Sequence, residues 1–231
     1  MDYDSFLDLV KKRRSTHSFK ADPVPDEYVD KIIEAGRWAP SGANSQPWEF
    51  VVVKRIDLRE RIVEIFKAQG EISYTIEQTR EPDHRFPRYR TPPQGTPGFA
   101  HAPVLIITCG DPRTTESYPL KAKLDRGEST FYSSLASAFL YMHLAATVLG
   151  LGSQWVSASA QDLMQARLKQ LLEVPYEMEI YDMMALGYPA SEPKPRKVRS
   201  REEVVHYDTF DKSRTRTDRQ VRDLIKSLWK R

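Results

Sequence analysis

Apolar and polar residues follow two different patterns along this chain. Over residues 25–38, Val29, Ile32, Ile33 and Gly36 recur at the spacing that places side chains on one face of a helix. Elsewhere, short apolar runs such as "WEFVVV" and "PVLIITCG" lie between turn residues and are typical of buried strands. Together these patterns predict helices over 5–13, 25–38, 57–69 with a continuation to about 78, 129–150, 160–172 and 217–231, and strands over 48–54, 103–110, 153–157 and 180–189.

Helices and strands succeed one another irregularly, which favours an α+β fold, a mixed central sheet flanked by helices. No linker or internal repeat divides the sequence. We therefore expect a single domain over residues 1–200 and a C-terminal extension over 201–231, extended at first and ending in a helix. The helix over 129–150 is apolar around most of its circumference, which places it in a core or an interface. Its apolar stripe consists of Phe131, Leu135, Phe139, Met142 and Ala146.

Residues 80–100 contain five prolines, two glycines and four arginines, a composition that predicts a long loop. Loops of this length in compact domains often cover a binding site. Arg85, Arg88, Tyr89 and Arg90 make this segment a candidate lid that would attract acidic substrates or the extra phosphate of NADPH. A solvated loop without such a role is the simpler interpretation.

The composition is that of an ordinary globular protein, with 40% hydrophobic and 29% charged residues among 231. A net charge of +3 is too small to indicate nucleic-acid binding by itself. The single cysteine, Cys109, lies in an apolar run, so we expect a buried thiol and no internal disulfide. Because neither a signal peptide nor an apolar run of 18 residues is present, we expect a cytoplasmic protein that does not span a membrane.

Three polar stretches are candidates for chemistry: "KKRRSTHSF" (11–19), "PSGANSQPW" (40–48) and "KPRKVRS" (194–200). The first would either complement the negative end of a helix or bind a phosphate through arginine forks and a serine hydroxyl. The second is either an ordinary polar loop or a set of amides and hydroxyls that binds a ligand. The third is a solvated tail or a nucleic-acid contact, but no aromatic residues are interleaved with its charges. No G-x-G-x-x-G follows a strand, so a Rossmann dinucleotide site is not supported.

The basic turn, "APSGANSQPW", "GLGSQW" and "GYPASEPKPRK" occur in this order, and over residues 10–207 the sequence resembles the FMN-dependent nitroreductase family. The resemblance implies an intertwined homodimer with a swapped C-terminal segment, and one FMN site for each chain. The resemblance implies that the FMN phosphate and ribityl chain would be bound by Arg13, Arg14 and Ser15, and that the same phosphate would be closed off by Lys197 and Arg199. The flavin would be reached from the partner subunit by Pro40, Ser41, Gly42 and Asn44. The isoalloxazine ring would lie against Ser157 and Ala158.

Three residues depart from the family pattern. His17 stands where the family usually has arginine or lysine near the N1/O2 edge of the flavin. A histidine has an ordinary pKa of about 6.5, so at that place it would make the flavin potential depend on pH near neutrality. A surface imidazole without this role is the alternative. Ser157 and Ala158 replace the "GG" or "EG" of many members, so their contact near N5 is less well specified.

The resemblance implies an oxidoreductase that takes hydride from NADH or NADPH and passes it to a nitroaromatic or quinone in a ping-pong reaction. The flavin carries this chemistry, so we predict neither a catalytic side chain nor a metal. Dehalogenating, flavin-fragmenting and azoline-oxidising reactions are alternatives in the same fold, and a non-catalytic flavin-binding protein is another. The expected partners are a second copy of the chain and a small-molecule acceptor, without nucleic acid or membrane.

Overall fold

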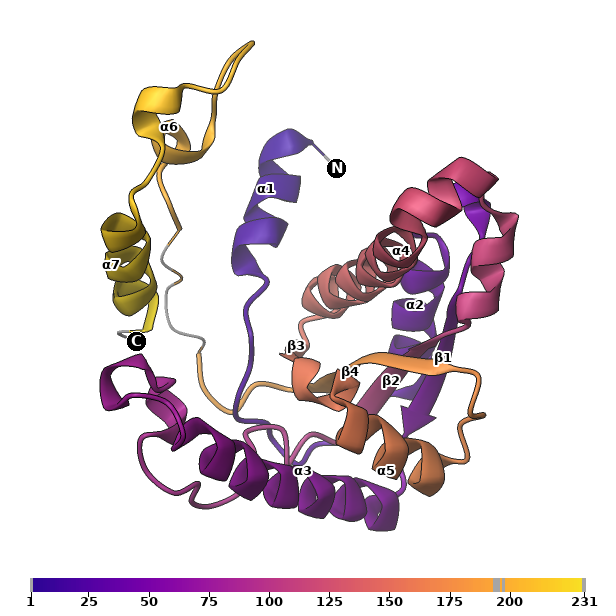
Figure 1. Ribbon diagram of the computed structural model, residues 1–231. Coiled ribbons are helices and arrows are strands. Elements are labelled where there is room, and N and C mark those ends of the chain that lie inside the picture. Colours follow the sequence, from indigo (N-terminus) through magenta and orange to yellow (C-terminus); the bar gives the residue numbers. More distant parts are fainter. Residues whose placement is uncertain (1, 193–195, 197, 230–231) are drawn as a thin grey trace.

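The computed structural model describes residues 2–192, 196 and 198–229, and its centre is a four-stranded sheet (Figure 1). The strand order is β1-β2-β4-β3, and each neighbouring pair is antiparallel. The helices and this sheet confirm the α+β class. The strands are β1 Trp48–Val53, β2 Val104–Gly110, β3 Gly152–Val156 and β4 Glu179–Gly187.

The strand directions differ from the expected mixed sheet for a topological reason. β2 and β3 run the same way, because a long helix between them returns the chain to the same end of the sheet. They are not neighbours, however, because β4 lies between them and is antiparallel to both. Among the described residues, parallel pairing is limited to an isolated bridge between Ser15 and Ser153.

Alternate residues of the buried strands point to opposite layers of helices. Val104 and Ile106 of β2 pack on the side of α2 and α4, whereas Leu105 and Ile107 pack on the side of α3 and α5 (Figure 1). Cys109 is buried in the same strand, as expected, and burial raises the pKa of its thiol to about 12. The helices are α1 Tyr3–Lys12, α2 Asp26–Arg37, α3 Ile56–Glu77, α4 Leu120–Val148, α5 Asp162–Leu172, α6 Arg201–Val204 and α7 Asp218–Trp229.

Helix α4 begins nine residues before the predicted helix over 129–150. Its first turns, "LKAKLDRGE", are charged and mostly exposed, so they lack the apolar pattern on which the prediction depended. The stripe from Phe131 to Ala146 is buried within this chain, which confirms its role in the core. The opposite side of α4 exposes Leu140, Tyr141 and Val148. Among the described helices, none combines the length and apolar character that a membrane span requires.

The segment after residue 200 differs from the extended chain that the sequence suggested. Ser200 and Glu203 form a capping box that starts the short helix α6, and α7 follows as predicted. No residue between 200 and 228 is buried in this chain, and the apolar side chains Val221, Ile225 and Leu228 of α7 are exposed. The segment therefore adds nothing to the core described above.

The loop over 80–100 has only two single-turn 3₁₀ helices, but hydrogen bonds fix its course. The side-chain amide of Gln78 donates to the carbonyl of Tyr89 at 2.8 Å, and the backbone N–H of Phe86 donates to the carboxylate of Glu77 at 2.6 Å. At its other end, Gly98 lies so close to His17 that a Cβ there would come within 2.9 Å of the His17 carbonyl oxygen. The loop thus lies directly against His17 of the basic turn, and its role as a lid stays a prediction.

The contribution of α4 to the core can be measured with two matched leucines. Leu135 is fully buried (0% exposed), so Leu135→Ala should lower the free energy of unfolding by about 2–5 kcal/mol. Leu124 on the same helix is 76% exposed, and Leu124→Ala should change it by less than about 0.5 kcal/mol. Urea denaturation monitored by circular dichroism measures both, and equal effects would contradict the assigned packing.

Candidate functional site

The basic turn after α1 is attached to two strands of the sheet. The backbone N–H of Thr16 donates to the carbonyl of Ser153 in β3 at 2.9 Å, and the N–H of Lys20 donates to the carbonyl of Tyr188 just after β4 at 2.9 Å. The N–H of Ala190 returns a bond to the carbonyl of Ser18. The chain that leaves β4 therefore runs beside residues 15–20 and carries the later basic segment toward the first.

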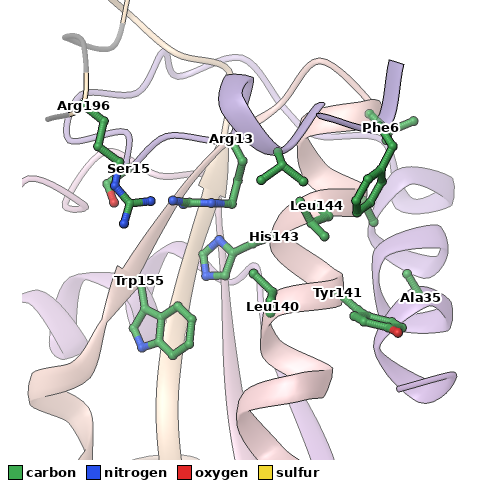
Figure 2. Close-up of a pocket in the computed structure, with 13 residues that line it drawn as sticks. Phe6, Arg13, Ser15, Ala35, Leu140, Tyr141, His143, Leu144, Trp155 and Arg196 are labelled. Atoms are coloured by element: carbon green, nitrogen blue, oxygen red, sulfur yellow. The ribbon is translucent and has the colours of Figure 1, made fainter. Parts of the chain in front are cut away.

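Arg13 and Arg196 meet at a cavity of about 730 Å³ (Figure 2). Their guanidinium groups point toward each other beside Ser15, above the ring of His143. Burial lowers the pKa of Arg13, and the nearby charges of Arg196 and Arg14 lower it further. Among the described residues, no carboxylate pairs with Arg13 or Arg196. Two like charges that share a cavity repel each other, and an anion between them would relieve that repulsion.

A buried imidazole forms the floor of this cavity. The Nδ1 atom of His143 is 2.7 Å from the hydroxyl of Ser153, and the ring lies parallel to the Trp155 indole with 5.5 Å between centroids. Burial lowers the pKa of His143 to about 3, and Arg13 contributes in the same direction. His143 is therefore neutral at pH 7, and the cations of the site are the arginines. The sequence patterns did not identify this residue; the signal was a histidine in an otherwise apolar helix.

Behind Trp155 lies a buried carboxylate. The indole N–H of Trp155 donates to Oδ2 of Asp182 in β4, whereas Oδ1 has no hydrogen-bond partner among the described residues. Burial raises the pKa of Asp182 to about 7, against the opposing effect of the indole hydrogen bond. This side chain was also not identified from the sequence. It fixes the orientation of Trp155, which is one wall of the cavity.

The polar loop 40–46 lies at a different hollow, which shares no lining residue with the Arg13 cavity. The backbone N–H of Gly42 donates to the hydroxyl of Ser134 on α4, and the N–H of Gln46 donates to the hydroxyl of Ser41, both at 3.0 Å. A Cβ on Gly42 would lie 2.3 Å from a methyl carbon of Thr130, so only glycine allows the loop to approach α4 this closely. Contacts with Ser134 and Thr130 of α4 thus fix the position of the loop.

Comparison with known proteins agrees with this fold. The sequence model of the nitroreductase family matches residues 10–188. The chain belongs to the nitroreductase family. This confirms the resemblance seen in the sequence motifs.

Several relatives of the chain carry different names. A protein of Archaeoglobus fulgidus, provisionally named NADH dehydrogenase/NAD(P)H nitroreductase, is 26% identical over 186 residues, which are 80% of this chain and 86% of that protein. The iodotyrosine deiodinase of Danio rerio is 27% identical over 192 residues, 83% of this chain but 62% of that protein. Membership of the nitroreductase family therefore does not fix one reaction.

Two solved structures have a similar fold. A BluB-like flavoprotein from Clostridium difficile 630 superposes with a TM-score of 0.66 and 28% identity, over 90% of this chain and 100% of that chain. An iodotyrosine deiodinase crystallised with FMN and 3-iodo-L-tyrosine gives a TM-score of 0.65 and 26% identity, over 88% of this chain and 99% of that chain.

The predicted nitroreductase site residues fall into separate places in the single chain. Arg13 and Ser15 line the cavity, and half-buried Arg14 acts on Arg13 through its charge. His17 is exposed and lies against Gly98. Pro40, Ser41, Gly42 and Asn44 belong to the second, α4-anchored loop, so their expected contact with the flavin of a partner subunit stays a prediction.

The motif indicated Lys197 and Arg199 in the later basic segment, but the described residue of this segment that lines the cavity is Arg196. Arg199 does not line it; its guanidinium donates to the carbonyl of Glu203 at 2.6 Å. Arg196, three residues earlier, faces Arg13 because the chain crosses residues 15–20 soon after β4. Lys197 lies outside the described residues. Arg196 thus lines the cavity from within the segment that the motif indicated, and the binding roles of Lys197 and Arg199 stay predictions.

Ser157 and Ala158 form the turn that follows β3. They are four and five residues beyond Ser153, or about 13–17 Å along an extended chain. Ser157 is exposed and Ala158 is half-buried. They do not line the Arg13 cavity but directly follow β3, the strand whose Trp155 is one wall of it.

Asp182→Asn tests the cost of burying the carboxylate behind Trp155. The folded pKa is about 7, whereas an unfolded aspartate titrates near about 4. Through this group the wild type therefore loses stability as the pH rises from about 4 to about 7. Asparagine accepts the indole hydrogen bond and does not ionise. We expect Asp182→Asn to be more stable than the wild type at pH 8, with an advantage that shrinks toward pH 5.

Urea denaturation at several pH values measures this difference. A difference in unfolding free energy that is the same at pH 5 and pH 8 would contradict the raised pKa of Asp182.

Proposed function

We propose that this chain is an FMN-dependent oxidoreductase that takes hydride from NADH or NADPH and reduces an electron-poor acceptor of the nitroaromatic or quinone type. The observation that carries the proposal is the meeting of Arg13 and Arg196, 183 positions apart in the sequence, at one cavity. Membership of the nitroreductase family, whose relatives include FMN-bound proteins, supports the choice of anion.

The groups at this cavity suit a phosphomonoester. Two guanidiniums provide forked N–H donors that keep their charge at all relevant pH values, and Ser15 adds a hydroxyl. The Nε2 atom of His143 is buried without a hydrogen-bond partner among the described residues, so the floor has an unused polar atom. FMN, when bound, would supply the ring that accepts and donates hydride. Arg13, Arg14, Ser15 and Arg196 would hold its phosphate.

The contribution of the protein in this proposal is binding and orientation. The arginines fix the anionic end of the cofactor, and β3 leads from Ser153 toward Ser157 and Ala158, where the resemblance expects the flavin ring. A quinone that takes a hydride also takes one proton from water and leaves as hydroquinone. Because water can supply that proton, we assign no acid or base side chain.

A second copy of the chain completes the proposed enzyme. Apolar side chains are exposed on α1 (Phe6 and Val10), on α4 (Leu140 and Val148) and on α7. The segment after residue 200 has no buried residue up to 228 in its own chain, which supports its expected role of wrapping a partner. In such a homodimer, loop 40–44 of one copy would reach the flavin held by the other.

Reductive dehalogenation is a second candidate reaction, supported by the similarity to iodotyrosine deiodinases. In that reaction two electrons and one proton replace the halogen of an aromatic ring by hydrogen, and halide leaves. The same cofactor site would serve both reactions, so the acceptor distinguishes them.

An absorbance spectrum of the purified protein, followed by anaerobic addition of NADH or NADPH, tests the proposal. We expect a flavin spectrum that bleaches with at least one nicotinamide and returns when a quinone or nitroaromatic is added. Halide release from a halogenated phenol after chemical reduction would favour the second candidate. A protein that neither contains nor binds FMN would refute both.

The two cavity arginines can be compared directly with Arg199. Arg13→Gln and Arg196→Gln should each weaken FMN binding by about 10- to 100-fold, because each removes a charge-assisted hydrogen bond. Arg199→Gln should change the dissociation constant for FMN by less than about threefold, since the Arg199 guanidinium donates to the backbone carbonyl of Glu203 and does not line the cavity. Lys12→Gln, at the exposed end of α1, is the matched control. Quenching of FMN fluorescence on titration with apoprotein measures each dissociation constant, and a larger loss at Arg199 than at Arg196 would contradict the assignment.

A further inference from the structure

Except for Asn44, the residues that line the hollow beside loop 40–46 have no role in the proposed function. This hollow has a volume of about 360 Å³ and lies where α2 ends and the loop begins. Its lining residues are Arg37, Trp38, Ala39, Asn44 and Gln46.

One wall is an indole whose orientation is fixed. Trp38 is 78% exposed, and its N–H donates to Oε1 of Glu34 at 2.8 Å. The other oxygen of Glu34 accepts from Arg37 at 2.5 Å. These two hydrogen bonds, that of Trp38 first, lower the pKa of Glu34 and keep it ionised. A single exposed tryptophan needs no functional explanation. The indole of Trp38, however, is fixed by the hydrogen bond from its N–H to Glu34, and its ring lines the hollow.

The loop residues that line the hollow have a backbone held in an unfavourable conformation. Ala43, Asn44 and Gln46 have φ angles of 49°, 51° and 44°, in the left-handed region that non-glycine residues rarely adopt. Such conformations cost free energy and persist where their surroundings enforce them, often at ligand sites. Here Ser134 and Ser41 enforce them through the bonds described above.

The loop presents amide groups at the edge of this hollow. The side-chain amide of Asn44 has no hydrogen-bond partner among the described residues, and that of Gln46 has only a long bond of 3.4 Å to the Asn44 carbonyl. A flat apolar face combined with free amide donors fits a planar aromatic ring with oxygen substituents. An electron-poor ring is favoured because the indole face is electron-rich.

We propose that this hollow binds the aromatic electron acceptor, with its ring stacked on Trp38 and a nitro or quinone oxygen accepting a hydrogen bond from the Asn44 amide. This deepens the proposed function and rests on it, because loop 40–44 would place the acceptor next to the flavin of a second copy. Arg37 contributes positive charge at the rim, although Glu34 compensates part of it.

Trp38→Leu in the protein as purified tests the proposal. For 4-nitrobenzyl alcohol, a neutral nitroaromatic, we expect the KM to rise about three- to tenfold, the factor that ring stacking contributes. The KM for ferricyanide, which has no ring, should not rise in proportion. Trp38→Phe should restore most of the binding. Tyr176→Leu is the matched control, because Tyr176 is also a surface aromatic, 91% exposed, outside this hollow.

Three results would overturn the proposal: an unchanged KM for the nitroaromatic, an equal rise for both acceptors, or loss of FMN from Trp38→Leu, which would assign the indole to the cofactor. Equilibrium dialysis of 4-nitrobenzyl alcohol requires no catalysis and separates this proposal from the proposed function. If the wild-type protein carries no FMN, tighter binding of 4-nitrobenzyl alcohol to the wild type than to Trp38→Leu still supports an aromatic site in this hollow. Equal or undetectable binding to both proteins overturns the proposal.

Discussion

The mutual repulsion of Arg13 and Arg196 is the physical constraint on which the proposed site depends. Two guanidiniums at one cavity raise each other's free energy, and partial burial adds to the cost, which is why the pKa of Arg13 is lowered. The two basic segments stay together despite this repulsion because the backbone N–H groups of Thr16, Lys20 and Ala190 donate hydrogen bonds that fix their course. An anion between the arginines would reverse the sign of the interaction. Binding of an anion there would therefore relieve a repulsion that is already present in the free protein.

The buried groups beneath the arginines support this electrostatic arrangement. A protonated His143 would add a third positive charge, and its burial prevents that. Its Nδ1 contact with Ser153 also links α4 to the residue of β3 that accepts the hydrogen bond of Thr16. A neutral imidazole thus fixes the strand against which the basic turn is built, without adding to the repulsion between the arginines.

The helices and strands could be predicted from the sequence where the apolar residues recur at a regular spacing. They could not be predicted where tertiary contacts determine the structure. The buried strands and α2 were found because their apolar residues face a core. The first turns of α4 were missed because exposed charged residues show no such period. The family motif indicated the later basic segment but not Arg196, the residue that lines the cavity, since the crossing point of two loops depends on pairing with Tyr188 and Ser18, which no local pattern encodes. His143 and Asp182 were not identified because only burial makes them exceptional.

Helix α4 also determines how the two hollows of the chain are related. Ser134 holds loop 40–46 and His143 lies under the arginines, and both are buried on this one helix. Nine residues separate them, which corresponds to about 13 Å along the axis. Because α4 is packed against the sheet along this stretch, loop movement in one chain cannot merge the two hollows without breaking the core. The proposed homodimer offers another arrangement, in which loop 40–46 of one chain would reach the flavin that the arginines of the other chain would hold.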